Sequence, residues 1–76
     1  MRELLTYLAQ RLVDNPAAVR VEEVDQEGVM VLQLHVAKED VGKVIGRQGR
    51  IARALRTVVR AGGARAHRPT RVEILD

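Results

Sequence analysis

The spacing of apolar residues changes from segment to segment, and this change restricts the folds that the chain can form. Residues 2–14 carry leucines that fall on one stripe of a helix, namely Leu4, Leu5, Leu8 and Leu12. Residues 18–25 and 29–37 instead place apolar side chains at alternate positions, which is typical of half-buried strands. The polar stretch from Gln26 to Gly28 separates these strands, so the two segments are predicted to form a hairpin.

Helical spacing returns in the second half of the chain, at residues 39–45 and 50–61, and alternation returns at 70–76. Gly62 and Gly63 are predicted to end the second of these helices. A chain of 76 residues has room for one core. We therefore expect one α+β domain over residues 1–76. It has the order α-β-β-α-α-β and a three-stranded mixed sheet covered by three helices on one face.

The composition argues against several classes of protein. The chain has no cysteine, which excludes disulfide bonds and thiol chemistry and favours a cytoplasmic protein. No apolar run is long enough to cross a membrane. His35 and His67 have no second ligand at a recognisable spacing, so neither a metal nor another cofactor is expected. The threonines have no His or Asp arranged as around a nucleophile, so no enzyme is predicted.

Charge is distributed unevenly along the chain. Residues 1–40 hold four basic and eight acidic side chains, whereas residues 41–76 hold nine basic and two acidic ones. Such an asymmetry in a small domain is typical of a surface that binds a polyanion. A solvated helix face followed by a basic loop is the alternative that explains part of the same pattern.

Four residues, Gly46-Arg47-Gln48-Gly49, interrupt the helical spacing between 39–45 and 50–61. Glycine lacks a Cβ, so this turn can adopt unusual dihedral angles and another backbone can approach it closely. The turn also precedes the N-terminus of a helix, where unpaired N–H groups favour an anion. With Lys43 and Arg50 on either side, the turn has the parts of a phosphate-binding corner.

Two well-known phosphate loops do not fit this turn. A P-loop ending at Gly42-Lys43 needs glycine in place of Ala37 and a hydroxyl residue in place of Val44. A dinucleotide-binding fingerprint ending at Gly49 needs glycine in place of Val44. A nucleotide-hydrolysing or dinucleotide-binding enzyme is therefore not supported.

Three arginines follow the turn on the predicted helix 50–61, at Arg53, Arg56 and Arg60. At 3.6 residues per turn they lie on the side opposite to the apolar residues of the same helix. They consequently point away from the core. A solvated face explains them at least as well as a ligand contact does.

The stretch Ile45-Gly46-Arg47-Gln48-Gly49, in this order of elements, resembles the I-G-x-x-G signature of KH domains in their type II, prokaryotic arrangement. Nearly the whole chain resembles the small bacterial single-KH RNA-binding proteins of the KhpA type. The resemblance implies that the turn clamps the backbone of about four single-stranded nucleotides, and that their bases lie in an adjoining apolar groove. Val41, Val44 and Ile45 could supply that groove or belong to the core.

The RNA-binding residues expected from this resemblance are one cluster: Gly46, Arg47, Gln48 and Gly49 as the clamp, Lys43 and Arg50 as flanking cations, and Ile45 as groove surface. For Val44 and Ile45, however, a role in the core is the better interpretation, because a helix of two turns must use its apolar residues to anchor itself. Gly42 serves either helix packing or ligand access, and the sequence leaves both open.

The resulting prediction is a non-enzymatic RNA-binding protein of broad specificity, acting as an RNA chaperone or post-transcriptional regulator. A single four-nucleotide clamp binds weakly, so pairing of domains is expected to add affinity. The resemblance implies a homodimer, or a heterodimer with a larger KH-containing protein. One alternative is a dimerisation module with incidental nucleic-acid binding, using Val31 and Leu75 on strand faces expected to be exposed. Another is binding of single-stranded DNA, since nothing in the sequence reads a 2′-hydroxyl.

Overall fold

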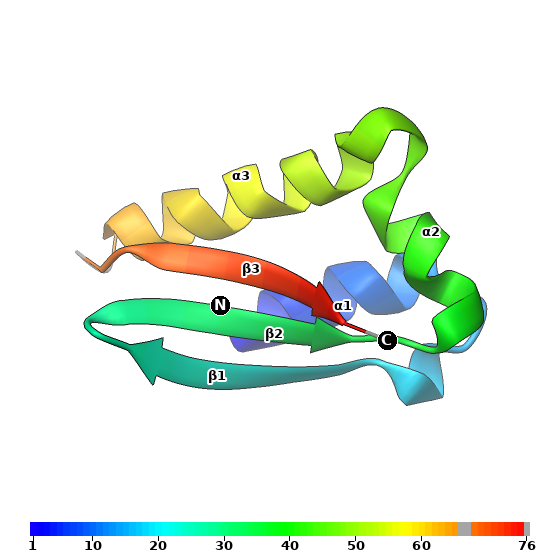
Figure 1. Ribbon diagram of the computed structural model, residues 1–76, viewed down its shortest axis with the longest axis horizontal. Helices are drawn as coiled ribbons and strands as arrows, with labels where there is room; N and C mark the ends of the chain where they lie inside the picture. Colours follow the sequence, from blue (N-terminus) through cyan, green and yellow to red (C-terminus); the bar gives the residue numbers. More distant parts are fainter. Residues whose placement is uncertain (66–67, 76) are drawn as a thin grey trace.

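The computed structural model describes residues 1–65 and 68–75 of the chain, and Figure 1 shows its elements. In chain order these are α1 (Arg2–Leu12), β1 (Arg20–Gln26), β2 (Val29–His35), α2 (Val41–Ile45), α3 (Arg50–Arg65) and β3 (Thr70–Leu75). The predicted order α-β-β-α-α-β is confirmed. A 3-10 turn at Pro16–Ala18 precedes β1, another at Lys38–Asp40 leads into α2, and a third at Arg47–Gly49 separates α2 from α3.

The three strands form one mixed sheet in the order β1-β2-β3. β1 pairs with β2 in antiparallel orientation, and β2 pairs with β3 in parallel orientation. Leu32 in the central strand stands opposite Glu23 of β1 and Val72 of β3. Because β3 runs parallel to β2, the chain must cross back along the sheet between them, and α2 and α3 make that crossing (Figure 1).

One face of the sheet and the three helices enclose an aliphatic core. Its members come from every helix and strand and are buried: Leu5, Ala9, Val21, Leu32, Leu34, Val36, Val44, Leu55, Val59 and Val72. The opposite face of the sheet carries exposed polar side chains such as Glu22, Gln26 and Arg71. The helices therefore cover one face only, as predicted.

The β1–β2 hairpin turns at Glu27 and Gly28, which both have positive φ, 55° and 86°. This is the conformation that two-residue hairpin loops require, and glycine at the second position adopts it without strain. The Asp25 carboxylate accepts a hydrogen bond from the Gly28 N–H at 3.1 Å. The predicted hairpin is confirmed.

Gly62 and Gly63 do not end α3, which continues to Arg65. A Cβ on Gly62 would overlap the side chain of Met1, and one on Gly63 would lie 2.7 Å from the carbonyl oxygen of Arg68. The predicted helix stop is wrong because these glycines admit neighbouring chain segments close to the last turns of the helix.

Val31 was expected on an exposed strand face, and that expectation is wrong. Its side chain is fully buried although it points away from the helices. In the register of the sheet, Val24 and Arg71 stand on either side of it, and directly opposed residues on one face of a sheet are close enough for their side chains to pack together. Leu75 is 37% exposed, so this second residue does lie on an open surface.

Within the part of the chain that the structure describes, no helix is both long and apolar enough to cross a membrane. Among the same residues, no group of three or more His, Asp or Glu side chains is arranged to hold a metal ion. His67 lies outside the described residues.

Candidate nucleic-acid interface

The glycine turn, Gly46–Gly49, forms a sharp corner between α2 and α3. Gly46 ends α2 with φ 76° and ψ 172°, a conformation essentially restricted to glycine. Its N–H closes the last bond of α2 on the Gly42 carbonyl at 2.9 Å. Gly49 also has a positive φ, 73°, and its N–H donates to the Gly46 carbonyl at 3.1 Å. Both predicted glycines are therefore used for their backbone conformation.

The two glycines differ in what surrounds them. A Cβ on Gly46 would lie 2.6 Å from Cγ1 of Ile51, so the side chain of Ile51 packs directly against the bare backbone. A Cβ on Gly49 would meet no atom within 4 Å. Gly46 thus fixes how α3 packs against the turn, whereas the space beside Gly49 is open to a ligand.

Polar side chains surround this open space at the start of α3. Arg47 and Gln48 are exposed, and Gln48 is held in a left-handed conformation with φ 56° and ψ 25°. Arg50, the first residue of α3, donates from Nη2 to the Gln48 Oε1 at 3.4 Å. The Arg50 N–H donates to the Arg47 carbonyl, and the dipole of α3 adds a local positive potential at this end. An anion at this corner would meet two guanidinium groups and a helix N-terminus together.

Val44 and Ile45 take different roles, although a core role was favoured for both. Val44 is fully buried and belongs to the core, as predicted. Ile45 is 37% exposed and lies next to the glycine turn. Its side chain is therefore accessible as apolar surface beside the turn.

Lys43, expected as a flanking cation, is engaged with carboxylates of the chain itself. Its Nζ lies 3.2 Å from Oδ2 of Asp14 and 3.7 Å from Oδ1 of Asp40. The hydrogen bond to Asp14 and the charge of Asp14 raise the pKa of Lys43 above its ordinary value, and the charge of Asp40 adds to this. Lys43 stays protonated at neutral pH, but these two acids offset much of its attraction for an outside anion.

Asp40 is a buried carboxylate that the sequence did not single out. Only 2% of the residue is exposed, and its oxygens accept hydrogen bonds from the N–H groups of Asp14 at 3.3 Å and Asn15 at 3.0 Å. These bonds tie the chain after α1 to the start of α2. An aspartate before a helix suggests an N-cap, yet Asp40 makes no capping bond. It therefore acts by positioning α2, the helix that presents the glycine turn.

Arg56 and Arg60 face a groove rather than bulk solvent alone. They border it together with Arg71, and the other lining residues are Val29, Pro69, Thr70 and Val72. We refer to it as the arginine groove. A helical wheel places Arg56 and Arg60 opposite the apolar residues of α3, but it does not reveal that β3 stands beside them. Their proximity to Arg71 was missed for that reason.

A second groove lies on the other flank of α3, between this helix and α1. Its lining is almost entirely aliphatic, with one arginine from each helix at its border: Leu8, Arg11, Leu12, Arg50, Ile51, Ala54, Leu55 and Val58. Leu12 is 36% and Val58 is 40% exposed. The leucine stripe of α1 is therefore only partly covered within one chain. We call this surface the apolar groove.

Comparison with known proteins identifies the family. The family model described as "KhpA/KhpB, KH domain" matches residues 2–74. The chain belongs to the KhpA/KhpB family of KH domains. The resemblance noted from the sequence is thereby confirmed. The prediction of a non-enzymatic protein agrees with membership of this family.

Relatives of the chain are similar over nearly their full length. The RNA-binding protein KhpA of Treponema pallidum is 51% identical over 74 residues, which cover 97% of this chain and 92% of that protein. The proteins of the same name from Clostridium acetobutylicum and Halalkalibacterium halodurans are 49% and 45% identical. These alignments cover 99% and 100% of this chain, and all of each relative.

A solved structure shows the same fold. A crystal structure of Aquifex aeolicus Era bound to GDP and aluminium fluoride matches 96% of this chain with a TM-score of 0.68 and 16% sequence identity. The match covers 28% of that chain. The similarity concerns the fold alone, and it agrees with the type II KH arrangement expected from the sequence.

Proposed function

We propose that this protein binds single-stranded RNA by holding its sugar-phosphate backbone at the glycine turn. The observation that carries the proposal is the geometry of Gly46–Gly49. Bare backbone beside Gly49 is open, Arg47 and Gln48 are exposed on it, and the N-terminus of α3 begins behind it. The names of the full-length relatives, which refer to RNA binding, support this choice of ligand.

Each residue of the predicted cluster has a distinct part in this proposal. Gly49 lets the RNA backbone approach, Gly46 sets the packing of the turn against Ile51, and the positive N-terminal end of α3 attracts a phosphate. Arg47 and Arg50 supply charge, with Arg50 oriented by Gln48. Ile45 offers apolar contact to a ribose or a base. Lys43 contributes less, because Asp14 and Asp40 already hold it.

Contacts to the backbone carry no sequence information. The protein is therefore expected to have broad specificity and to act in the cytoplasm as an RNA chaperone or post-transcriptional regulator. No separate enzymatic step is required for either role. Few phosphates are neutralised by one clamp, so binding by one copy should be weak and should depend only shallowly on salt.

The ligand is tested by titrating the protein against RNA and DNA oligonucleotides of the same single-stranded sequence, with fluorescence anisotropy as the readout. We expect a lower Kd for RNA and a loss of affinity with salt at a slope of about −0.7 per phosphate contact. Equal Kd values for the two would favour a general single-strand binder. A lower Kd for DNA would contradict the proposal.

We further propose that the apolar groove is the contact surface of a homodimer. Exposed leucine and valine side chains from α1 and α3 lie together there, and an apolar patch of this kind is typical of a protein–protein contact. The arginine groove lies on the opposite flank of α3, so both surfaces can be occupied at once. Two linked clamps would bind one RNA with a higher effective concentration. A larger KH-containing protein presenting a similar surface could replace the second copy.

The dimer is tested by Val58→Glu, which places a charge in the apolar groove at a side chain already 40% exposed. We expect the mass measured by size-exclusion chromatography with light scattering to fall to that of a monomer, because a buried unpaired charge costs several kcal/mol. Thr57→Glu is the matched control, since Thr57 is exposed on α3 and does not line the groove. A Val58→Glu protein that remains dimeric would exclude this surface.

A further inference from the structure

Two residues at the start of α3 belong to two surfaces at once. Ile51 lines the apolar groove, and its Cγ1 lies 2.6 Å from the position that a Cβ on Gly46 would take. Arg50 borders the same groove, while its Nη2 donates to the Gln48 Oε1 at 3.4 Å. The glycine turn and the apolar groove are therefore not independent, because these two side chains of α3 contact both.

A second arginine lies at the same end of the apolar groove. A Cβ on Gly62 would overlap the side chain of Met1, so the start of α1 lies beside the last turns of α3. The end of α1 then lies beside the start of α3, and Arg11 and Arg50 both border the groove there. Among the described residues, no ion pair involves either arginine. This end of the groove thus carries two positive charges without a carboxylate partner.

These charges oppose the pairing of two copies at the apolar groove. A second copy that covers the groove removes water from its apolar side chains and also from the surroundings of the two guanidinium groups. Removing water from a cation costs free energy unless an anion offsets its charge. A phosphate held at the glycine turn supplies that negative charge beside Arg50. A copy with RNA bound should therefore pair at a lower cost than a free copy.

Pairing should in turn prepare the glycine turn for RNA. An apolar partner on the groove disfavours a guanidinium placed over it, so Arg50 stays directed at the turn, where Gln48 orients it. Ile51 is only partly buried in one copy, and a partner packed on its outer side would hold it against Gly46. A site that is already fixed in its bound conformation loses less freedom when the ligand binds.

We infer that RNA binding at the glycine turn and pairing of two copies at the apolar groove strengthen each other through Arg50 and Ile51. This inference rests on the proposed function, both for the RNA clamp and for the dimer. The two effects have the same size by thermodynamic necessity, because each event changes the free energy of the other equally. RNA thus regulates the assembly of its own binding protein.

The test measures the dimer dissociation constant by analytical ultracentrifugation, with and without saturating tetrauridine. One clamp holds about four nucleotides, so a tetranucleotide cannot bridge two clamps and avidity is excluded. We call the ratio of the two constants the coupling factor. If pairing tightens each of the two clamps about fivefold, the coupling factor is the square of that value, about 25. A dimer dissociation constant that RNA leaves unchanged or raises overturns the inference.

The reciprocal measurement uses the Kd for tetrauridine, determined by fluorescence anisotropy. Monomeric Val58→Glu should bind tetrauridine about fivefold more weakly than the dimeric control Thr57→Glu, which carries the same added charge. Equal Kd values for the two proteins overturn the coupling and leave the clamp and the dimer in place. Failure of the dimer is seen separately, as a Val58→Glu protein that remains dimeric. Failure of the clamp is seen as RNA binding retained after substitution of Arg47 and Gln48.

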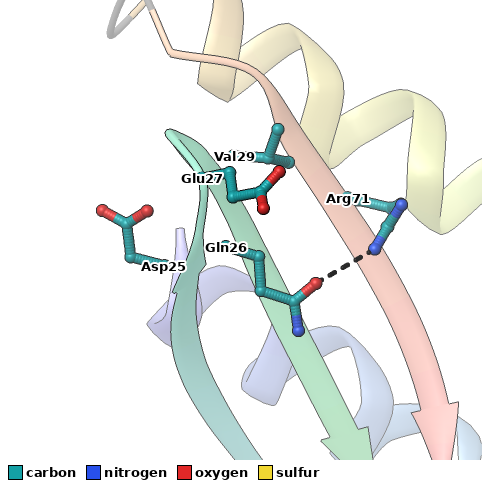
Figure 2. A pocket seen from close by; sticks show the side chains of 5 residues that line it. All are labelled: Asp25, Gln26, Glu27, Val29 and Arg71. Carbon is teal, nitrogen blue, oxygen red and sulfur yellow. Dashed lines mark hydrogen bonds between the residues drawn. The ribbon is translucent and has the colours of Figure 1, made fainter.

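The residues that carry the coupling are tested by two pairs of variants. Arg50→Gln should lower the coupling factor to less than about 5, whereas Arg71→Gln should keep it. Figure 2 shows Arg71 at the hairpin, bonded to Gln26, and it does not line the apolar groove. Ile51→Val removes the Cδ1 that packs near Gly46 and should also lower the factor, whereas Ile74→Val makes the same change in β3. Equal factors within both pairs would exclude these residues as the link.

Discussion

The Gly46→Ala protein is expected to unfold at a markedly lower urea concentration than the unsubstituted protein. At φ 76° and ψ 172° an alanine is strained, and its Cβ would overlap Ile51 at 2.6 Å from Cγ1. Strain and overlap together should lower the free energy of unfolding by about 3 kcal/mol. Urea unfolding followed by far-UV circular dichroism measures this loss, at one fixed protein concentration because a dimer's stability depends on concentration.

Two other glycines of the same region provide matched controls. Gly49→Ala has the unfavourable φ of 73° but no steric neighbour, so it should cost about 1 kcal/mol. Gly42 lies in helical backbone with open space around it, and Gly42→Ala should raise stability by about 0.5 kcal/mol. The geometry of the turn therefore predicts that the free energy of unfolding decreases from Gly42→Ala to Gly49→Ala to Gly46→Ala. Equal stabilities for all three variants would contradict it.

Elements that depend on short-range features could be predicted from the sequence. The hairpin follows from alternation on both sides of Glu27 and Gly28, and the break between α2 and α3 follows from two glycines within four residues. Such features are decided by local dihedral preferences and by the period of the apolar pattern. The family resemblance rested on the same turn.

Features that depend on distant segments could not be predicted in this way. Gly62 and Gly63 look like a helix end until Met1 and the chain before β3 are seen against them. The partners of Asp40 are backbone groups 25 and 26 residues earlier in the chain. For Arg56, a helical wheel gives a direction relative to its own helix but not the strand on the other side. These contacts come from tertiary packing, which no local pattern encodes.

Substitutions in the glycine turn are expected to cause the largest loss of RNA affinity. Replacing Arg47 and Gln48 by aspartate removes a cation and a polar contact from the glycine turn and places two negative charges there. The left-handed conformation of Gln48 is one that aspartate adopts readily, so the backbone should be retained. A charged hydrogen bond is worth about 1.5–3 kcal/mol and repulsion adds to its loss, so the Kd for single-stranded RNA should rise about a hundredfold or more.

The most direct test of this account is therefore the Kd of the Arg47→Asp, Gln48→Asp protein for a single-stranded RNA, measured beside Arg2→Asp, Gln10→Asp. The control makes the same two residue changes on α1, away from the glycine turn. We predict that the first protein loses RNA binding while its circular dichroism spectrum and oligomeric state stay unchanged, and that the control loses only a few-fold. If the two proteins bind RNA with equal affinity, the glycine turn is not the RNA site.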